Sequence, residues 1–251
     1  MTRIHACSLA LIGAALVPAT ATSAARAARS DSFAVIELFS SEGCSSCPPA
    51  ERLLGELADD AKRSGRNILT LEFHVDYWNS LGWADPFSSA AFTARQQQYA
   101  RTLGLRSLYT PQMIVNGIDE FVGSDRGRAR RGVDAALARA GSARITLRAT
   151  PGDGATRVEY QVAGAPQDAV LCVALVESGL VTRVLRGENS GRTLSHTSVV
   201  RAFVTAPLAG GGIGSLDLKT GATAGKHSRQ AIAFVQDRRT MAILGAAVAN
   251  L

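Results

Sequence analysis

The apolar positions near the start of the chain change from strand spacing to helix spacing and back. FAVIELFS, at residues 33–40, is a β-branched and aromatic run of strand length that ends in a Ser/Gly cluster. A helical face follows and ends before Gly65; it consists of Leu53, Leu54, Leu57, Ala58 and Ala61. NILTLEFHV, at residues 67–75, has the character of a second strand. The pattern therefore predicts a βαβ unit with two parallel strands.

Three further patterns complete the first half of the chain. Apolar residues recur at helical spacing between residues 77 and 104, which predicts a helical insertion. YTPQMIVNGIDEFVG, at residues 109–123, predicts two short strands that meet at Asn116-Gly117, a pair typical of a two-residue hairpin turn. An apolar helical stripe then ends at Gly141. The expected order is strand, helix, strand, helical insertion, strand, strand and helix.

The second half, from residue 142 onward, consists of short β-rich runs separated by Gly, Pro and Asp. The runs of strand length are RITLRAT, TRVEYQV, AVLCVALVE, SVVRAFVT, QAIAFVQ and TMAILGAAV. Strands at such intervals are typical of an antiparallel sandwich. The pattern thus predicts an α/β domain over residues 31–141, with the helical insertion at 77–104, followed by an all-β sandwich-like domain over residues 142–251.

The first residues indicate the compartment in which we expect the mature protein to reside. Arg3 and His5 precede an apolar run at residues 6–17 and small residues at 19–25, as in a cleavable secretory signal. No later stretch approaches the roughly 20 apolar residues of a spanning helix. We therefore predict that residues 1–25 are removed and that the mature chain is secreted or periplasmic, without stable membrane association. Disulfides persist in such compartments.

Composition and charge exclude one class of partner. The chain is 46% hydrophobic and 19% charged, which is ordinary for a globular protein, and its formal net charge of +6 is spread along the sequence. The densest basic cluster lies between Arg126 and Arg131 and lacks interleaved aromatic residues or a nucleic-acid motif. We therefore read this cluster as a solvated helix face and do not expect a nucleic-acid partner.

Three cysteines remain after the signal, and two of them form a Cys-x-x-Cys pair. Cys44 and Cys47 lie between the first strand and the first helix, where a helix N-terminus stabilises a thiolate and the second sulfur can resolve a mixed disulfide. Zinc ribbons share this spacing but need a second Cys or His pair, which is missing here. Cys172 lies in an apolar run and is predicted to be buried and unreactive.

Several motifs together resemble a known family. They are ELFSSEGCSSCPPAE, HVDYW, YTPQMIVNG and GENSGRTLSHTSVVRAF. The chain is similar to a bacterial family of secreted, functionally uncharacterised proteins with a thioredoxin-like half, domain of unknown function 1223. The resemblance implies an α/β thioredoxin-like fold for the first domain. For the thioredoxin superfamily it implies that Cys44 is the nucleophile, Cys47 the resolving thiol and Pro111 a cis residue, with Thr110 holding a substrate strand.

Other polar residues near the thiols are candidates for supporting roles. His74 and Trp78 follow the second strand, at the sheet edge where ligands of parallel sheets gather, and could line a substrate groove. Glu37 could accept the proton of the resolving thiol through a water, although a solvent-facing glutamate is the ordinary interpretation. Glu42 is expected to be exposed. The polar loop at 185–197, which carries His196, either covers the thiols or only connects strands.

These observations predict a thiol-disulfide oxidoreductase that exchanges with a protein or a small-molecule thiol or disulfide. No cofactor and no metal site are expected for this activity. The alternative is a non-catalytic binding module. In that case Cys44, Cys47 and His74 would bind a soft ion such as Cu(I), or the cysteine pair would only close a structural disulfide.

Overall fold

A computed structural model describes Met1 and residues 32–208, 212–219 and 227–251 of the chain. The expected signal segment therefore lies outside the described residues, apart from Met1. No helix within the described ranges has the length and apolar character needed to cross a bilayer.

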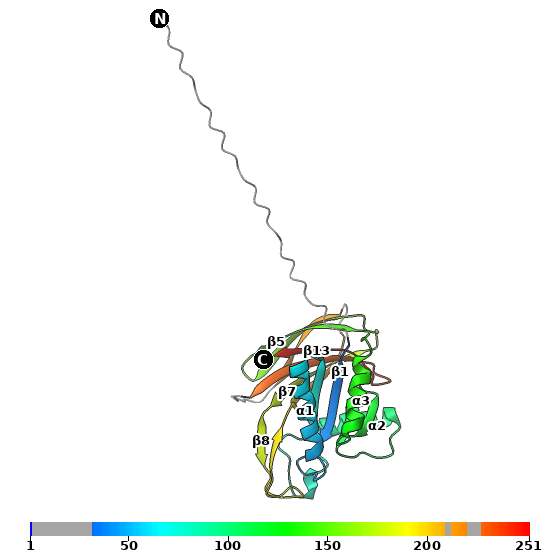
Figure 1. The fold of residues 1–251 in the computed structure, drawn as a ribbon, viewed down its shortest axis with the longest axis vertical. Coiled ribbons are helices and arrows are strands. Elements are labelled where there is room, and N and C mark those ends of the chain that lie inside the picture. Colours follow the sequence, from blue (N-terminus) through cyan, green and yellow to red (C-terminus); the bar gives the residue numbers. More distant parts are fainter. Residues whose placement is uncertain (2–31, 209–211, 220–226) are drawn as a thin grey trace.

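One large mixed sheet dominates the molecule (Figure 1). Its strand order is β13-β12-β7-β10-β2-β1-β3-β4. These eight strands are β1 (Ala34–Ser40), β2 (Ile68–His74), β3 (Gln112–Val115), β4 (Asp119–Val122), β7 (Val170–Ser178), β10 (Val199–Pro207), β12 (Ser228–Gln236) and β13 (Ile243–Asn250). Strands from both halves of the sequence thus lie in the same sheet.

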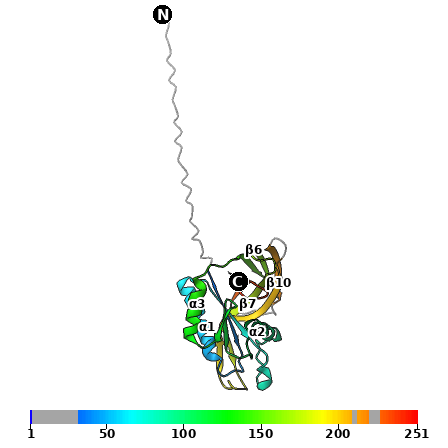
Figure 2. The same cartoon turned by 90° about the vertical axis from the view of Figure 1, so that its right-hand side faces the viewer.

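Helices cover both faces of the first-half strands. They are α1 (Pro48–Ser64), α2 (Ala90–Leu103) and α3 (Arg126–Leu137), with a 3-10 turn, η1 (Asn79–Leu81), before α2. Helices α1 and α3 share one apolar cluster with alternate residues of β1, while α2 packs into the cluster on the opposite face (Figure 2). The alternation of side chains along a strand separates these two clusters.

Two smaller sheets complete the fold. The three-stranded sheet has the order β11-β6-β5, and β8 pairs with β9. Their bounds are β5 (Arg144–Pro151), β6 (Ala155–Ala163), β8 (Leu180–Arg183), β9 (Thr193–His196) and β11 (Ile213–Lys219). The three-stranded sheet shares a third apolar cluster with β7 and β12.

The expected order of elements in the first half is confirmed. Strands β1 and β2 are parallel, with Ala34 opposite Ile68. Gly65 ends α1 with φ +69°, and Asn116 and Gly117 both have positive φ between β3 and β4. The six strands expected in the second half are also present.

The predicted fold class, in contrast, is wrong. The described part of the chain is mostly β, with 43% of its residues in strands against 22% in helices, and these residues form no separate α/β thioredoxin-like layer. Strand β10 pairs in parallel with β2 at Val199 and Glu72, so the first-half sheet continues into second-half strands. Strand β7 is apolar on both faces because one face packs toward α2 and the other toward the three-stranded sheet. The second half is therefore not a free-standing sandwich.

The prediction of a helical insertion at residues 77–104 is also wrong. Within residues 77–104 the structure has η1 and a single α-helix, and Phe92 and Tyr99 of that helix are buried in the main apolar cluster. Helix α2 is therefore part of the core of the molecule and is not an addition to a complete domain.

Candidate functional site

The two cysteines lie on the loop that joins β1 to α1 and are joined by a disulfide. Cys47 is the N-cap of α1, and its carbonyl oxygen accepts hydrogen bonds from the backbone N–H groups of Ala50 and Glu51. Pro48 and Pro49 occupy the first two helical positions, where a missing N–H group breaks no helical bond. The consecutive prolines thus fix the start of the helix at the cysteine pair.

Both cysteines are fully buried, and a second-half loop closes over them. We call residues 185–192 the covering loop. The side-chain amide of Asn189 donates to the carbonyl oxygens of Glu42 (2.8 Å) and Cys44 (3.0 Å). The backbone N–H of Ser45 donates to Glu188 at 2.9 Å. The sequence left open whether this loop covers the thiols or only connects strands. In the structure it lies on the cysteine loop.

The predicted partner residues lie at the same end of the sheet. The Thr110–Pro111 bond is cis, and Gln112 pairs with Phe39 near the carboxyl end of β1. A Cβ atom on Gly123 would lie 3.2 Å from the Cβ atoms of both Ala50 and Pro111, so Pro111 is close to the first turn of α1.

Trp78 lies between Thr110 and the cysteine loop and contacts Thr110 directly. Its indole N–H donates to the Thr110 hydroxyl oxygen at 2.9 Å, and its Cβ would be 3.2 Å from a Cβ atom on Gly43. Trp78 and Thr110 are both half-buried. The structure thus brings Trp78, Thr110 and Pro111 together beside the cysteine loop.

Glu37 is buried, whereas the ordinary interpretation of the sequence placed its side chain in solvent. Its fully buried carboxylate accepts hydrogen bonds from Arg95 at 2.5 and 2.9 Å and from the Tyr99 hydroxyl. Burial disfavours the charge on Arg95, but Glu37 outweighs this effect and raises the pKa of Arg95. The Glu37 oxygens are thus engaged by α2, and the structure shows no direct contact between this carboxylate and either cysteine.

His74 also lies in the interior. It is fully buried, with Nδ1 2.7 Å from Asp85 and Nε2 3.2 Å from Glu72. It therefore lines no surface groove in this structure, and its ring neighbours are Phe87 and His196. The metal-capable group that contains His74 includes Glu72 and His196 and neither cysteine.

His74 belongs to a larger set of buried polar residues, which we call the acid–histidine cluster: Glu42, Glu51, Glu72, His74, Asp85 and His196. His196 Nε2 lies 3.1 Å from Glu42, and Nδ1 lies 3.5 Å from Glu72 and 3.8 Å from Glu51. Glu51 also accepts a hydrogen bond from Ser40 at 2.6 Å. The cluster extends beneath the cysteine loop, since Glu42 precedes Cys44 and Glu51 follows Cys47.

Burial and mutual proximity shift the pKa values of the cluster in opposite directions. Burial, with a further contribution from Glu72, raises the pKa of Glu51 to about 7. Burial would also raise the pKa of Glu72, but His74 and His196 lower it to about 2. Burial disfavours protonation of His196, yet Glu42 and Glu72 raise its pKa to about 9. The cluster therefore carries charge in the interior.

Four members of this cluster escaped the sequence interpretation of the site. Glu42 was expected to be exposed and is fully buried. Glu72 was not singled out, although Glu72 and His74 are two residues apart in an apolar strand and so share one face. This polar face on an apolar strand was the feature of the sequence that could have indicated Glu72. Glu51 and Asp85 carried no comparable signal, because they approach the cluster only through the tertiary fold.

Cys172 is a free thiol on β7, in agreement with the prediction that it is buried. Its Sγ lies 3.6 Å from both Thr205 and Gln236. Burial raises the pKa of the Cys172 thiol, which disfavours its reactive thiolate.

Comparisons with known proteins place the chain in a family. A family model described as "Protein of unknown function (DUF1223)" matches residues 35–236. An X-ray crystal structure of a protein from Agrobacterium tumefaciens has 26% sequence identity and a TM-score of 0.64, and the match covers 86% of this chain and 92% of that one. No curated protein matches.

Other structural matches are too weak to support an inference about this chain. β-Glucuronidases from Ruminococcus gnavus and Lactobacillus rhamnosus are 10% and 14% identical, each with a TM-score of 0.26. These matches cover 45% and 44% of this chain and only 15% and 16% of the enzymes. The family match, in contrast, spans most of the sequence, including both cysteines and the acid–histidine cluster. The chain therefore belongs to the family of proteins of unknown function described as DUF1223.

Proposed function

We propose that the chain is a secreted or periplasmic thiol-disulfide oxidoreductase whose reactive group is the Cys44–Cys47 pair. The observation that carries the proposal is the disulfide at the N-cap of α1, beside the cis Thr110–Pro111 bond. The helix dipole at this position stabilises a thiolate and so makes the pair easier to reduce. The substrate is a protein or a small molecule with a thiol or a disulfide.

The exchange proceeds in two balanced steps. In the reduced protein, the Cys44 thiolate attacks a substrate disulfide, forms a mixed disulfide and releases one substrate thiolate. The Cys47 thiolate then attacks the Cys44 sulfur, which re-forms the internal disulfide and releases the second substrate thiolate. The substrate gains two electrons, and the protein pair loses two. The reverse sequence oxidises a substrate dithiol.

Two contacts support these roles. The Ser46 hydroxyl oxygen lies 3.3 Å from the Cys44 sulfur, where its proton can stabilise a thiolate, so Cys44 is the proposed attacking residue. Trp78, Thr110 and Pro111 lie together beside the cysteine loop and form the proposed substrate wall. Because both cysteines are fully buried, the covering loop has to move before a substrate can reach the sulfur atoms.

A second candidate is a structural disulfide without catalysis. The full burial of both cysteines and the Asn189 bonds to the cysteine loop favour it. The two candidates differ in reduction potential, because structural disulfides lie below about −300 mV and exchange-active ones lie higher.

The test is equilibration of the mature protein with glutathione buffers of stepped ratio, followed by alkylation and mass measurement. We expect Cys44 and Cys47 to convert together, reversibly and above about −300 mV, while Cys172 remains unalkylated in the folded state. A Cys172→Ser variant controls for the third thiol. A pair that stays oxidised in fully reduced glutathione would support the structural disulfide instead.

A further inference from the structure

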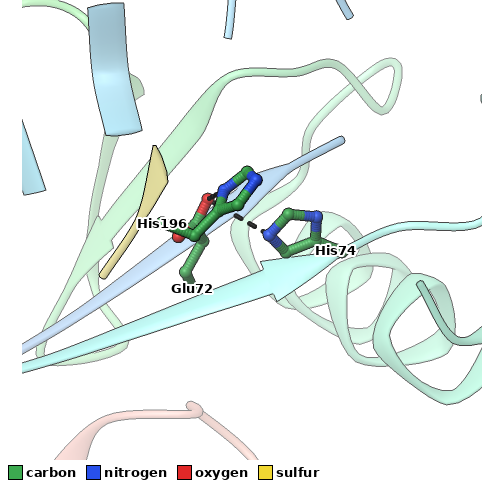
Figure 3. A group of neighbouring side chains, drawn as sticks. All are labelled: Glu72, His74 and His196. Carbon is green, nitrogen blue, oxygen red and sulfur yellow. Dashed lines mark ion pairs between the residues drawn. The ribbon is translucent and has the colours of Figure 1, made fainter. Parts of the chain in front are cut away.

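Three side chains of the acid–histidine cluster point polar atoms at one another, and Glu72 lies at ion-pair distance from both histidines (Figure 3). Glu72 and His74 come from one face of β2, and His196 is the last residue of β9. Their potential ligand atoms all lie within 4.8 Å of one another, and each side chain is at most 1% exposed. The convergence joins strands from both halves of the chain.

The converging atoms have no hydrogen-bond partner. This holds for both carboxylate oxygens of Glu72, for Nε2 of His74 and for Nδ1 of His196. A buried polar atom without a partner costs about 1–3 kcal/mol, and more when it is charged, so natural proteins rarely leave such atoms unpaired. Four of them at one point indicate that a partner of a different kind fits between them.

The remaining ring nitrogens are already fixed by carboxylates. Asp85 lies 2.7 Å from Nδ1 of His74, and Glu42 lies 3.1 Å from Nε2 of His196. Metal-binding histidines characteristically donate their second N–H to a carboxylate, which sets the tautomer and turns the free nitrogen toward the metal. Both histidines have this arrangement, from two different carboxylates.

The spacing of the free atoms also fits a metal. Glu72 Oε1 lies 3.2 Å from Nε2 of His74 and 3.5 Å from Nδ1 of His196. Ligands at about 2.0–2.1 Å from a tetrahedral zinc ion are separated by about 3.3 Å. Glu51 Oε2 lies 3.8 Å from Nδ1 of His196, but Glu51 does not belong to the group of three converging side chains.

We propose that Glu72, His74 and His196 form a binding site for a divalent transition metal of the zinc class. Two imidazoles and a carboxylate are a ligand set that suits Zn²⁺. Within the described part of the chain, no lysine or arginine forms an ion pair with the four carboxylates of the cluster, so the cation also offsets their charge.

The site is closed and contains no sulfur. Its ligands lie on β2 and at the end of β9, so the metal would tie a strand of the first half to a strand of the second half. Such a role is structural, because all three protein ligands are buried. The inference goes beyond the proposed redox function and does not depend on the state of Cys44 and Cys47.

The experiment uses the full mature chain with its disulfide intact. After treatment with a chelator and its removal, Zn²⁺ is titrated by calorimetry, and Co²⁺ is used as an absorption probe. We expect one equivalent of each ion to bind. The cobalt spectrum should show the visible bands of a tetrahedral nitrogen and oxygen site and should lack thiolate charge-transfer bands. A chain that binds no zinc, or that shows thiolate bands, overturns the proposal.

Variants locate the binding to these residues. Glu72→Gln and His196→Gln should weaken zinc binding by more than the about 10- to 100-fold that the loss of an outer partner costs. His227→Gln, which removes an exposed imidazole, and the Cys44→Ser/Cys47→Ser double variant should bind zinc as the parent does. Loss of binding in either control contradicts the assignment. If a ligand variant does not fold, the cobalt spectrum of the parent chain still decides the question, and the glutathione experiment remains separate.

Discussion

Buried charged residues occur in two contrasting arrangements in this molecule. Around Glu37, Arg95 and Tyr99 fill the hydrogen-bonding positions of the carboxylate, and the guanidinium lies over aromatic rings of the core. Around Glu72, both carboxylate oxygens lack a hydrogen-bond partner. The first arrangement is complete without a ligand, whereas the second is not. This difference between two buried glutamates is the basis for placing a metal at Glu72 and none at Glu37.

The complete arrangement leads to a stability prediction. Replacing Glu37 by Gln leaves the Arg95 charge buried without its carboxylate, so the free energy of unfolding should fall by about 3–5 kcal/mol. Chemical denaturation followed by circular dichroism measures the change. Glu56→Gln is the matched control, because Glu56 pairs with Arg126 at the surface and an exposed pair contributes at most about 1 kcal/mol. Equal losses for the two variants would contradict the account of Glu37.

At the scale of elements, the covering loop is hydrogen-bonded to the cysteine loop. Asn189 is buried and reaches two carbonyl oxygens of the cysteine loop, whereas its neighbour Ser190 is exposed and its side chain bonds to Leu185 within the covering loop. Access to sulfur limits thiol-disulfide exchange, so in the proposed reaction we expect the loop to open before the cysteines react.

Removal of the Asn189 amide should therefore speed reduction of the disulfide. In Asn189→Ala the loop loses both bonds, and an unpaired carbonyl group costs about 1–3 kcal/mol, which favours the open state by roughly 5-fold or more. The rate of reduction by dithiothreitol, followed by quenched alkylation, measures the effect. Ser190→Ala should reduce at the parent rate. An unchanged rate in Asn189→Ala would show that the covering loop does not limit access.

The elements were more predictable from the sequence than the way they assemble. Strands such as β1 and β7 have the length and composition of buried strands, and Gly65 and Asn116-Gly117 occupy positions that require positive φ. The pairing of β10 with β2 depends on contacts between residues more than 100 positions apart, as at Val199 and Glu72, and no local pattern encodes it. The fold class was wrong for this reason.

The residues of the candidate site also differ in whether the sequence could indicate them. Cys44 and Cys47 were visible because a short motif places them between a strand and a helix. His196 lies on a loop-connected strand far along the chain and meets Glu72 only in the assembled sheet. Residues brought together by long-range packing carry no shared spacing in the sequence, so the acid–histidine cluster became apparent only in the structure.

At the scale of the whole molecule, the two halves meet at the proposed reactive site. The first half supplies the cysteines and the cis Thr110–Pro111 bond, and the second half supplies the covering loop and His196. The large sheet continues from one half to the other through β2 and β10. We therefore expect that any exchange reaction of the cysteines requires the intact chain, and the decisive measurement has to be made on it.

That measurement is capture of a mixed disulfide by single-cysteine variants of the full chain. Cys47→Ser and Cys44→Ser are each incubated with oxidised glutathione, and the modified residue is identified by mass spectrometry. We expect a glutathione adduct on Cys44 in Cys47→Ser, formed faster than any adduct on Cys47 in Cys44→Ser. Adducts only on Cys47 would contradict the assignment of the attacking thiol, and no adduct on either residue in the folded protein would contradict the oxidoreductase itself.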